Sequence, residues 1–322
     1  MYKKADAHFE SNQFKQAATD YSIVAYGNDQ FKKGAYKLSN KAGYASLISY
    51  TKYIDQLKAK KETKKLIDTW QAKSVDAMLK FANVFHKDSR AIAVLTNAAQ
   101  ALFALNEYDR AIGVASDLIT KNKKLSKSLK QTAYGILAHS FFQKAEYQLA
   151  QNNYLAQRKL VAKKSADYVE ISNQIAASVY KKADQIKTKG NTKLAIKTLL
   201  SLKKLAPNSA IRVLAQYDAV SLLLAGKQWN SAIKELNSLK KKFPKHKLAV
   251  EFPRKLAFAY EQKKDWKKAA SAYVALFQKD PDPQVKQEAL FIAAGLQEKI
   301  GKDKKAIEYY RDYAHKYEKP YD

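Results

Sequence analysis

Cysteine is absent from the 322-residue sequence, and glycine and proline are scarce, with 9 and 6 copies. The lack of cysteine excludes disulfides, thiolate metal sites and cysteine nucleophiles. So few glycines and prolines disfavour a turn-rich β-sandwich or β-barrel. The longest stretch without a charged residue, 91–106, is too short and too polar for a membrane span. The sequence therefore predicts a chain without an integral membrane span.

Acidic residues are also few, because 59 Lys and Arg oppose 30 Asp and Glu and give a net charge of +29. This excess favours anionic partners, and it does not choose among nucleic acid, acidic lipid and acidic polymer. Only six of the basic residues are Arg, whose planar guanidinium forms bidentate hydrogen bonds with bases and phosphates. We therefore do not expect nucleic acid to be the partner.

Motifs for catalysis and cofactor binding are missing as well. The sequence has no glycine-rich phosphate loop and no His-Glu-x-x-His zinc motif. The five histidines, His8, His86, His139, His246 and His315, are far apart and fall in different helical units. Surface or packing roles suit them better than metal binding. The sequence predicts a protein that is not an enzyme and that holds no cofactor or metal.

An internal repeat is the main positive signal. Ala195, Ala232, Ala269 and Ala306 follow one another at intervals of 37 residues. Leucine or tyrosine stands four and seven residues after each alanine, a spacing that places them on one helix face. A proline twelve residues after the first three alanines ends that helix. A small or slim residue twelve positions before each alanine lets an antiparallel helix approach closely, so the unit is a helix hairpin.

Turns between the paired helices are marked by Gly190, Gly226 and Gly301. A residue that adopts positive φ commonly ends a helix, and glycine does so without steric cost. We expect these three glycines to cap the first helices of their hairpins. The corresponding turn at 263–265, Lys-Lys-Asp, lacks the glycine.

The pattern resembles the tetratricopeptide repeat family, whose unit has a small residue in its first helix, a bulky one before an alanine in its second helix, and a closing proline. Residues 229–244 (WNSAIKELNSLKKKFP) and 266–281 (WKKAASAYVALFQKDP) carry the resemblance best, and weaker copies centre on Ala17, Ala111 and Ala150. The resemblance implies an all-α, right-handed superhelical solenoid of antiparallel helix hairpins. It also implies that first helices line a concave side.

A single helical array is expected over residues 1–322. It divides into a partial first unit (1–30), an irregular unit with long helices near 36–57 and 62–85 (31–90), two longer units (91–175) and four regular units (176–322). The wide spacing before Ala195 predicts a lengthened helix near 157–168. Its ends lack a full opening helix and a polar cap, so we expect the array to belong to a longer chain or to self-associate through its ends.

Fifteen residues are expected to project from first helices into the concave groove. They are Thr96, Gln100, Phe103, His139, Phe142, Tyr180, Asp184, Lys187, Tyr217, Ser221, Arg254, Phe258, Glu261, Phe291 and Glu298. Tyr180, Arg254 and Phe258 are the strongest candidates, because exposed aromatic and Arg side chains carry much binding energy. For Phe103 and Phe142, packing between adjacent helices explains the residues equally well.

The resemblance implies a non-catalytic scaffold that binds a protein or peptide partner. The alternative is a polyanion binder that uses its lysine surface for nucleic acid or an anionic envelope polymer. The 37-residue units are similar to those of Gram-negative cell-envelope repeat proteins. We therefore expect a periplasmic or outer-membrane-associated location, with a role in envelope assembly, and the cytoplasm is the alternative location.

Overall fold

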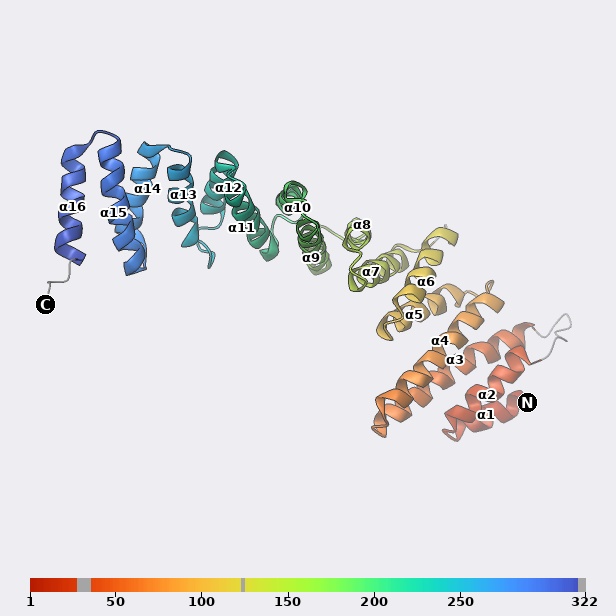
Figure 1. Cartoon of the computed structure of the whole chain (residues 1–322). Helices are drawn as coiled ribbons and strands as arrows, with labels where there is room; N and C mark the ends of the chain where they lie inside the picture. Colours follow the sequence, from red (N-terminus) through yellow and green to blue (C-terminus); the bar gives the residue numbers. More distant parts are fainter. Residues whose placement is uncertain (28–35, 123–124, 318–322) are drawn as a thin grey trace. The chain divides into compact units, whose positions relative to one another are not determined.

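The computed structural model describes residues 1–27, 36–122 and 125–317, and within these ranges it contains sixteen α-helices and no strand (Figure 1). Two compact units divide the chain, Met1–Ser178 and Val179–Asp322. Unit 1 contains α1 (Tyr2–Glu10), α2 (Phe14–Tyr26), α3 (Tyr36–Ala59), α4 (Lys64–Val84), α5 (Ala91–Ala104), α6 (Tyr108–Lys121), α7 (Lys127–Gln143) and α8 (Tyr147–Arg158). Helix α9 (Ala166–Thr188) contains the boundary. Unit 2 continues with α10 (Thr192–Leu205), α11 (Ala210–Ala225), α12 (Trp229–Lys242), α13 (Glu251–Gln262), α14 (Trp266–Lys279), α15 (Pro283–Lys299) and α16 (Asp303–Tyr317).

Each odd-numbered helix is the first helix of a hairpin and the next even-numbered helix is the second. Within unit 2, α13 to α16 pack side by side in chain order (Figure 1). The prediction of an all-α solenoid of helix hairpins is confirmed.

The repeated small residues form the hairpin interfaces. Ala195, Ala232 and Ala269 are fully buried in their second helices, and Ala306 is 3% exposed. The facing first-helix positions are closed to solvent too, since Ala257 is 0% exposed. Because an alanine has almost no side chain, the two helix backbones approach closely, and larger residues one turn away fill the space beside them. The 37-residue period read from the sequence is therefore the packing period of the hairpins.

The closing prolines end their helices as predicted. Pro207, Pro244 and Pro281 each stand two residues after the last residue of α10, α12 and α14. A proline cannot donate a backbone hydrogen bond and its ring clashes with the preceding turn, so the helix stops before it.

In the turns between the two helices of a hairpin, the residue with positive φ is more often another residue than glycine. Gly190 (φ 83°) and Gly301 (φ 71°) take the predicted positive φ, whereas Gly226 caps α11 as predicted but without a positive φ. Gly226 has φ −83°, and Lys227 beside it takes φ 54°. Six residues other than glycine occupy this left-handed position in hairpin turns of the described chain. They are Asn12, Lys61, Asn106, Ala145, Lys227 and Lys264.

The irregular part of unit 1 contains the long helices that the sequence predicts, α3 and α4. The predicted boundary between residues 30 and 31 lies outside the described residues. The lengthened helix predicted near 157–168 is α9, which has 23 residues where α11 has 16. It begins at Ala166, later than predicted, because α8 ends at Arg158 and the residues between the two helices are not helical.

Candidate functional site

A hollow of about 210 Å³ opens between the first helices α9 and α11 of unit 2. It is lined by Tyr180, Ala183, Asp184, Lys187, Leu199, Asp218, Ser221 and Leu222. Tyr180, Asp184 and Lys187 follow one another at four and three residues along α9, which places them on one helix face. Buried Ala183 and Leu199 form an apolar part of the lining. Four residues predicted for the groove, Tyr180, Asp184, Lys187 and Ser221, are thus brought together in one place.

A hydrogen bond joins the two sides of this hollow. The hydroxyl of Tyr180 donates to Oδ2 of Asp218 at 2.5 Å. This hydrogen bond, together with burial, raises the pKa of Tyr180 to about 12. The phenol therefore keeps its proton at neutral pH and remains a donor to the carboxylate. Among the described residues, Tyr180 is the hydrogen-bond partner found for Asp218.

Asp184 and Lys187 form an exposed ion pair at the rim of the hollow, with 3.1 Å between Oδ1 and Nζ. The side chains are 58% and 51% exposed. Such pairs contribute little to stability because water screens them. A partner's charged group can replace either member at small cost. The lining thus combines two carboxylates, one ammonium, one phenol and an apolar wall.

A second hollow, of about 500 Å³, lies between the first helices α13 and α15. Its lining is Glu261, Ile292, Gly295, Leu296, Glu298 and Lys299. Glu261 accepts a hydrogen bond of 2.6 Å from the hydroxyl of Tyr273, whose pKa is raised mainly by burial. Glu298 lies 3.5 Å from the hydroxyl of Tyr310. Both tyrosines belong to second helices, α14 and α16, whereas the two carboxylates belong to the first helices α13 and α15.

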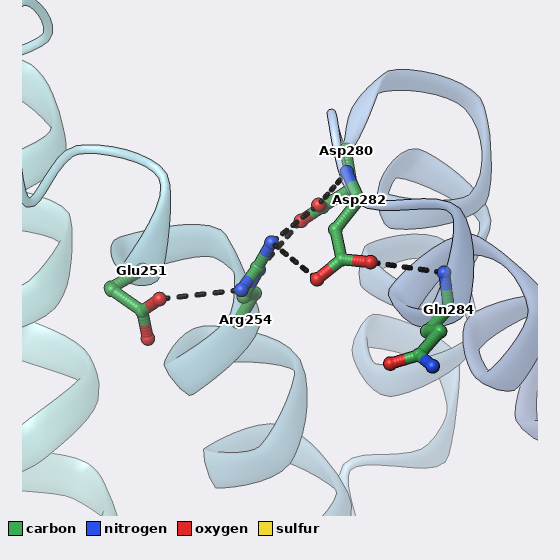
Figure 2. A network of polar contacts seen from close by, with 5 residues as sticks. All are labelled: Glu251, Arg254, Asp280, Asp282 and Gln284. Carbon is green, nitrogen blue, oxygen red and sulfur yellow. Dashed lines mark hydrogen bonds and ion pairs between the residues drawn. The ribbon is translucent and has the colours of Figure 1, made fainter.

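Arg254, a predicted groove residue, has its guanidinium bonded to carboxylates of its own chain. Figure 2 shows its side chain directed at the turn between α14 and α15. Nε donates to Oδ2 of Asp280 at 2.8 Å, and a terminal nitrogen donates to Oδ1 at 2.6 Å. Glu251 and Asp282 lie 3.3 and 3.9 Å from the guanidinium. This bidentate pair holds the α14–α15 turn against α13.

Predicted residues in unit 1 mostly pack inside it. Thr96 is buried and its hydroxyl donates to the carbonyl of Ile92, so the prediction that it faces a groove is wrong. His139 is half-buried, its Nδ1 lies 2.7 Å from the hydroxyl of Tyr154, and burial lowers its pKa. Gln100 is exposed on α5.

Phe103 and Phe142 follow the packing interpretation. Each is half-buried and contacts the tyrosine that begins the next helix, Tyr108 at 5.6 Å and Tyr147 at 5.2 Å between ring centroids. These contacts close the hairpin turns, and the rings are therefore part of the hairpin rather than of a free surface.

The remaining predicted residues of unit 2 differ in exposure. Phe258 is 43% exposed and contacts the ring of Trp229. Phe291 is 53% exposed and contacts the rings of two tyrosines of α16. Tyr217 is half-buried between the ring of Phe252 and the ammonium of Lys255. Phe258 and Phe291 thus remain available on the surface of the first helices.

Asp218 is the functional candidate that the sequence argument missed. The expected groove positions were counted from the small packing residue of each first helix, and Asp218 lies between two of them. A signal was present, because a carboxylate placed 38 residues after a tyrosine lies on the neighbouring first helix when the repeat is 37 residues long.

No group of three or more His, Asp or Glu side chains with metal-binding geometry occurs in the described ranges. None of the helices described is long and apolar enough to cross a bilayer.

Two segments of the chain, residues 214–246 and 288–319, match the tetratricopeptide repeat family. They cover most of the hairpins α11–α12 and α15–α16. These two segments are therefore similar to tetratricopeptide repeats, in agreement with the sequence pattern. Repeats of this kind generally mediate protein–protein interactions and are generally non-catalytic. No curated protein sequence matches the chain.

Similar solved structures include tetratricopeptide repeat proteins. One is MamA, from residue 41 to its end, from Desulfovibrio magneticus RS-1, with 16% identity, 58% of this chain and 94% of that chain covered, and a TM-score of 0.34. Another is the TPR2AB domain of yeast Sti1 in complex with pHSP90, with 14% identity, 84% and 98% coverage, and a TM-score of 0.35. A third, the C-terminal part of a repeat protein from Cytophaga hutchinsonii, has 21% identity, 68% and 78% coverage, and a TM-score of 0.32.

Proposed function

We propose that the chain is a scaffold that binds a protein partner on the first helices of unit 2, and that the α9–α11 hollow receives a lysine or arginine side chain of that partner. The observation that carries the proposal is the pair of carboxylates, Asp184 and Asp218, beside an apolar wall in that hollow. A cationic side chain pairs with the carboxylates, and its aliphatic stem covers Ala183 and Leu199.

The distribution of charge supports a cationic partner segment in spite of the net charge of +29. Counted over their full lengths, the first helices α9, α11, α13 and α15 each carry as many acidic as basic residues. The second helices α10, α12, α14 and α16 together carry fifteen basic and four acidic residues. In the α9–α11 hollow itself, two carboxylates (Asp184 and Asp218) stand beside one ammonium (Lys187).

An array of random peptides of about fifteen residues tests the proposal. We expect the peptides that bind the full chain to be enriched in lysine or arginine flanked by apolar residues. Binding of these peptides should be lost in the variant Asp184→Asn/Asp218→Asn. The matched control is Asp109→Asn/Asp117→Asn, which removes two exposed carboxylates from α6 of unit 1. An array with no basic enrichment, or equal losses in both variants, contradicts the proposal.

Polyanion binding through the whole lysine surface stands as the second candidate function, and the charge of the second helices favours it. It requires affinity for oligonucleotides or anionic envelope polymer that falls steeply with salt and is indifferent to sequence. If that affinity is absent at physiological salt, the candidate is wrong.

For location, we propose the periplasmic side of a Gram-negative envelope, with the cytoplasm as the alternative. The proposal rests on the 37-residue units and the absence of cysteine. Fractionation of the native cells with an antibody to the chain tests it, and a signal confined to the cytosolic fraction would reject it.

A further inference from the structure

A basic groove of about 600 Å³ lies between the second helices α10 and α12. It is lined by Lys193, Ile196, Lys197, Leu200, Ser201, Leu223, Gln228, Ser231, Lys234 and Glu235. None of these residues lines the α9–α11 hollow. We call this surface the α10–α12 groove.

Three lysines supply the free charge of the α10–α12 groove. Lys193 and Lys197 are four residues apart on α10, and Lys234 lies across the groove on α12. All three are exposed, and within the described residues no carboxylate lies at ion-pair distance from them. Like charges gathered in a recess raise the local concentration of an anionic ligand.

The single carboxylate of the groove is already neutralised. Glu235 is 6% exposed, and both of its oxygens accept hydrogen bonds of 2.9 Å from Lys203. Gln216 donates to it as well, at 2.7 Å. The carboxylate is therefore unavailable to the three lysines, and the groove keeps a net positive charge.

The lining also has an apolar part. Ile196 and Leu223 are 8% and 3% exposed, and Leu200 is half-buried. Ser201, Ser231 and Gln228 add hydroxyl and amide groups, which can bond to a peptide backbone. A ligand that fits this lining therefore combines negative charges with apolar side chains.

We propose that the α10–α12 groove binds an acidic, extended polypeptide segment that carries apolar side chains among its carboxylates. Such a segment pairs its carboxylates with the lysines and places its apolar side chains on Ile196 and Leu200. Single-stranded nucleic acid fits less well, because no aromatic side chain lines the groove to stack on a base and no arginine lines it. A bilayer surface does not enter a recess between two helices.

Fluorescence anisotropy with labelled probes tests the proposal on the full chain. The probes are a peptide of about fifteen residues with glutamate broken by a leucine at every third position, an all-glutamate peptide, oligothymidine, and phosphatidylglycerol vesicles. The groove variant is Lys193→Gln/Lys197→Gln/Lys234→Gln. The matched control is Lys52→Gln/Lys58→Gln/Lys60→Gln, which removes the same charge from exposed positions of unit 1. Far-ultraviolet circular dichroism verifies that both variants keep their helices.

We expect the wild type to bind the glutamate–leucine peptide more tightly than the other three probes. The groove variant should bind that peptide about tenfold more weakly, since three exposed ion pairs are lost. The control variant should change its affinity by less than about twofold. Equal losses in both variants, or tighter binding of oligothymidine or vesicles than of the peptide, would overturn the proposal. These outcomes do not depend on Asp184 or Asp218, so a failure of this proposal does not contradict the proposed function of the α9–α11 hollow.

Discussion

Replacing Arg254 with alanine should destabilise unit 2 rather than weaken a partner contact. Two short hydrogen bonds join its guanidinium to Asp280, whose side chain is 1% exposed. Removing the arginine leaves a buried carboxylate without its cation. Breaking a buried pair in this way costs about 3–5 kcal/mol. Because a quarter of the Arg254 side chain is exposed, and the N–H of Asp282 still donates to Asp280, we expect a smaller loss, of about 2 kcal/mol.

Urea unfolding followed by circular dichroism measures this loss. Arg110→Ala is the matched control, because Arg110 also bonds two carboxylates, Asp76 and Glu107, but these are 67% and 33% exposed where Asp280 is 1% exposed. We expect the control to lose less than about 1 kcal/mol. If both variants lose the same free energy of unfolding, the buried pair does not stabilise the turn. If Arg254→Ala unfolds like the wild type but binds the array peptides more weakly, Arg254 is a groove residue after all.

Two further predictions concern backbone strain and acid stability. Ala145 adopts φ 59°, which costs an L-residue about 1 kcal/mol, so Ala145→Gly should raise the free energy of unfolding. Gly190→Ala should lower the free energy of unfolding by a similar amount, because the added Cβ has no atom within 4 Å but the residue keeps a positive φ. Equal and opposite shifts in urea midpoints verify this prediction, and shifts of the same sign refute it. Hydrogen bonds from Arg90 lower the pKa of Asp88 from 3.8 to about 2, so the stability that Asp88 contributes is present above pH 3.8 and is lost as the pH falls through about 2. The stability difference between wild type and Asp88→Asn should therefore shrink over that range, and a constant difference would contradict the assignment.

Local regularities of the sequence were sufficient to predict the fold. Ala195 and Ala232 recur at the packing period, and the prolines mark helix ends, because both signals act within one or two turns of the chain. The position of the left-handed residue was predicted less well. At Lys227 the hairpin geometry imposes a positive φ on a residue that does not prefer it, so composition alone pointed to the neighbouring Gly226.

Side-chain partners across repeats were beyond the sequence argument. Arg254 pairs with Asp280, 26 residues away, and the acidic segment around Asp280 gives no sign of that partner. His139 and Tyr154 likewise meet only through helix packing. Counting along a first helix placed Tyr180 and Asp184 on one face, because their spacing is fixed within that helix. Counting along one helix could not identify contacts with residues of another helix, such as that between Arg254 and Asp280.

The affinity of the chain for one lysine-containing peptide recovered from the array tests the central claim most directly. Isothermal titration calorimetry compares the wild type, Asp184→Asn/Asp218→Asn and the control Asp109→Asn/Asp117→Asn. Because two ion pairs and their hydrogen bonds are removed, we predict affinity about tenfold or more weaker for the first variant and unchanged for the control. Wild-type affinity in Asp184→Asn/Asp218→Asn would contradict the assignment of the α9–α11 hollow as the site for a cationic side chain.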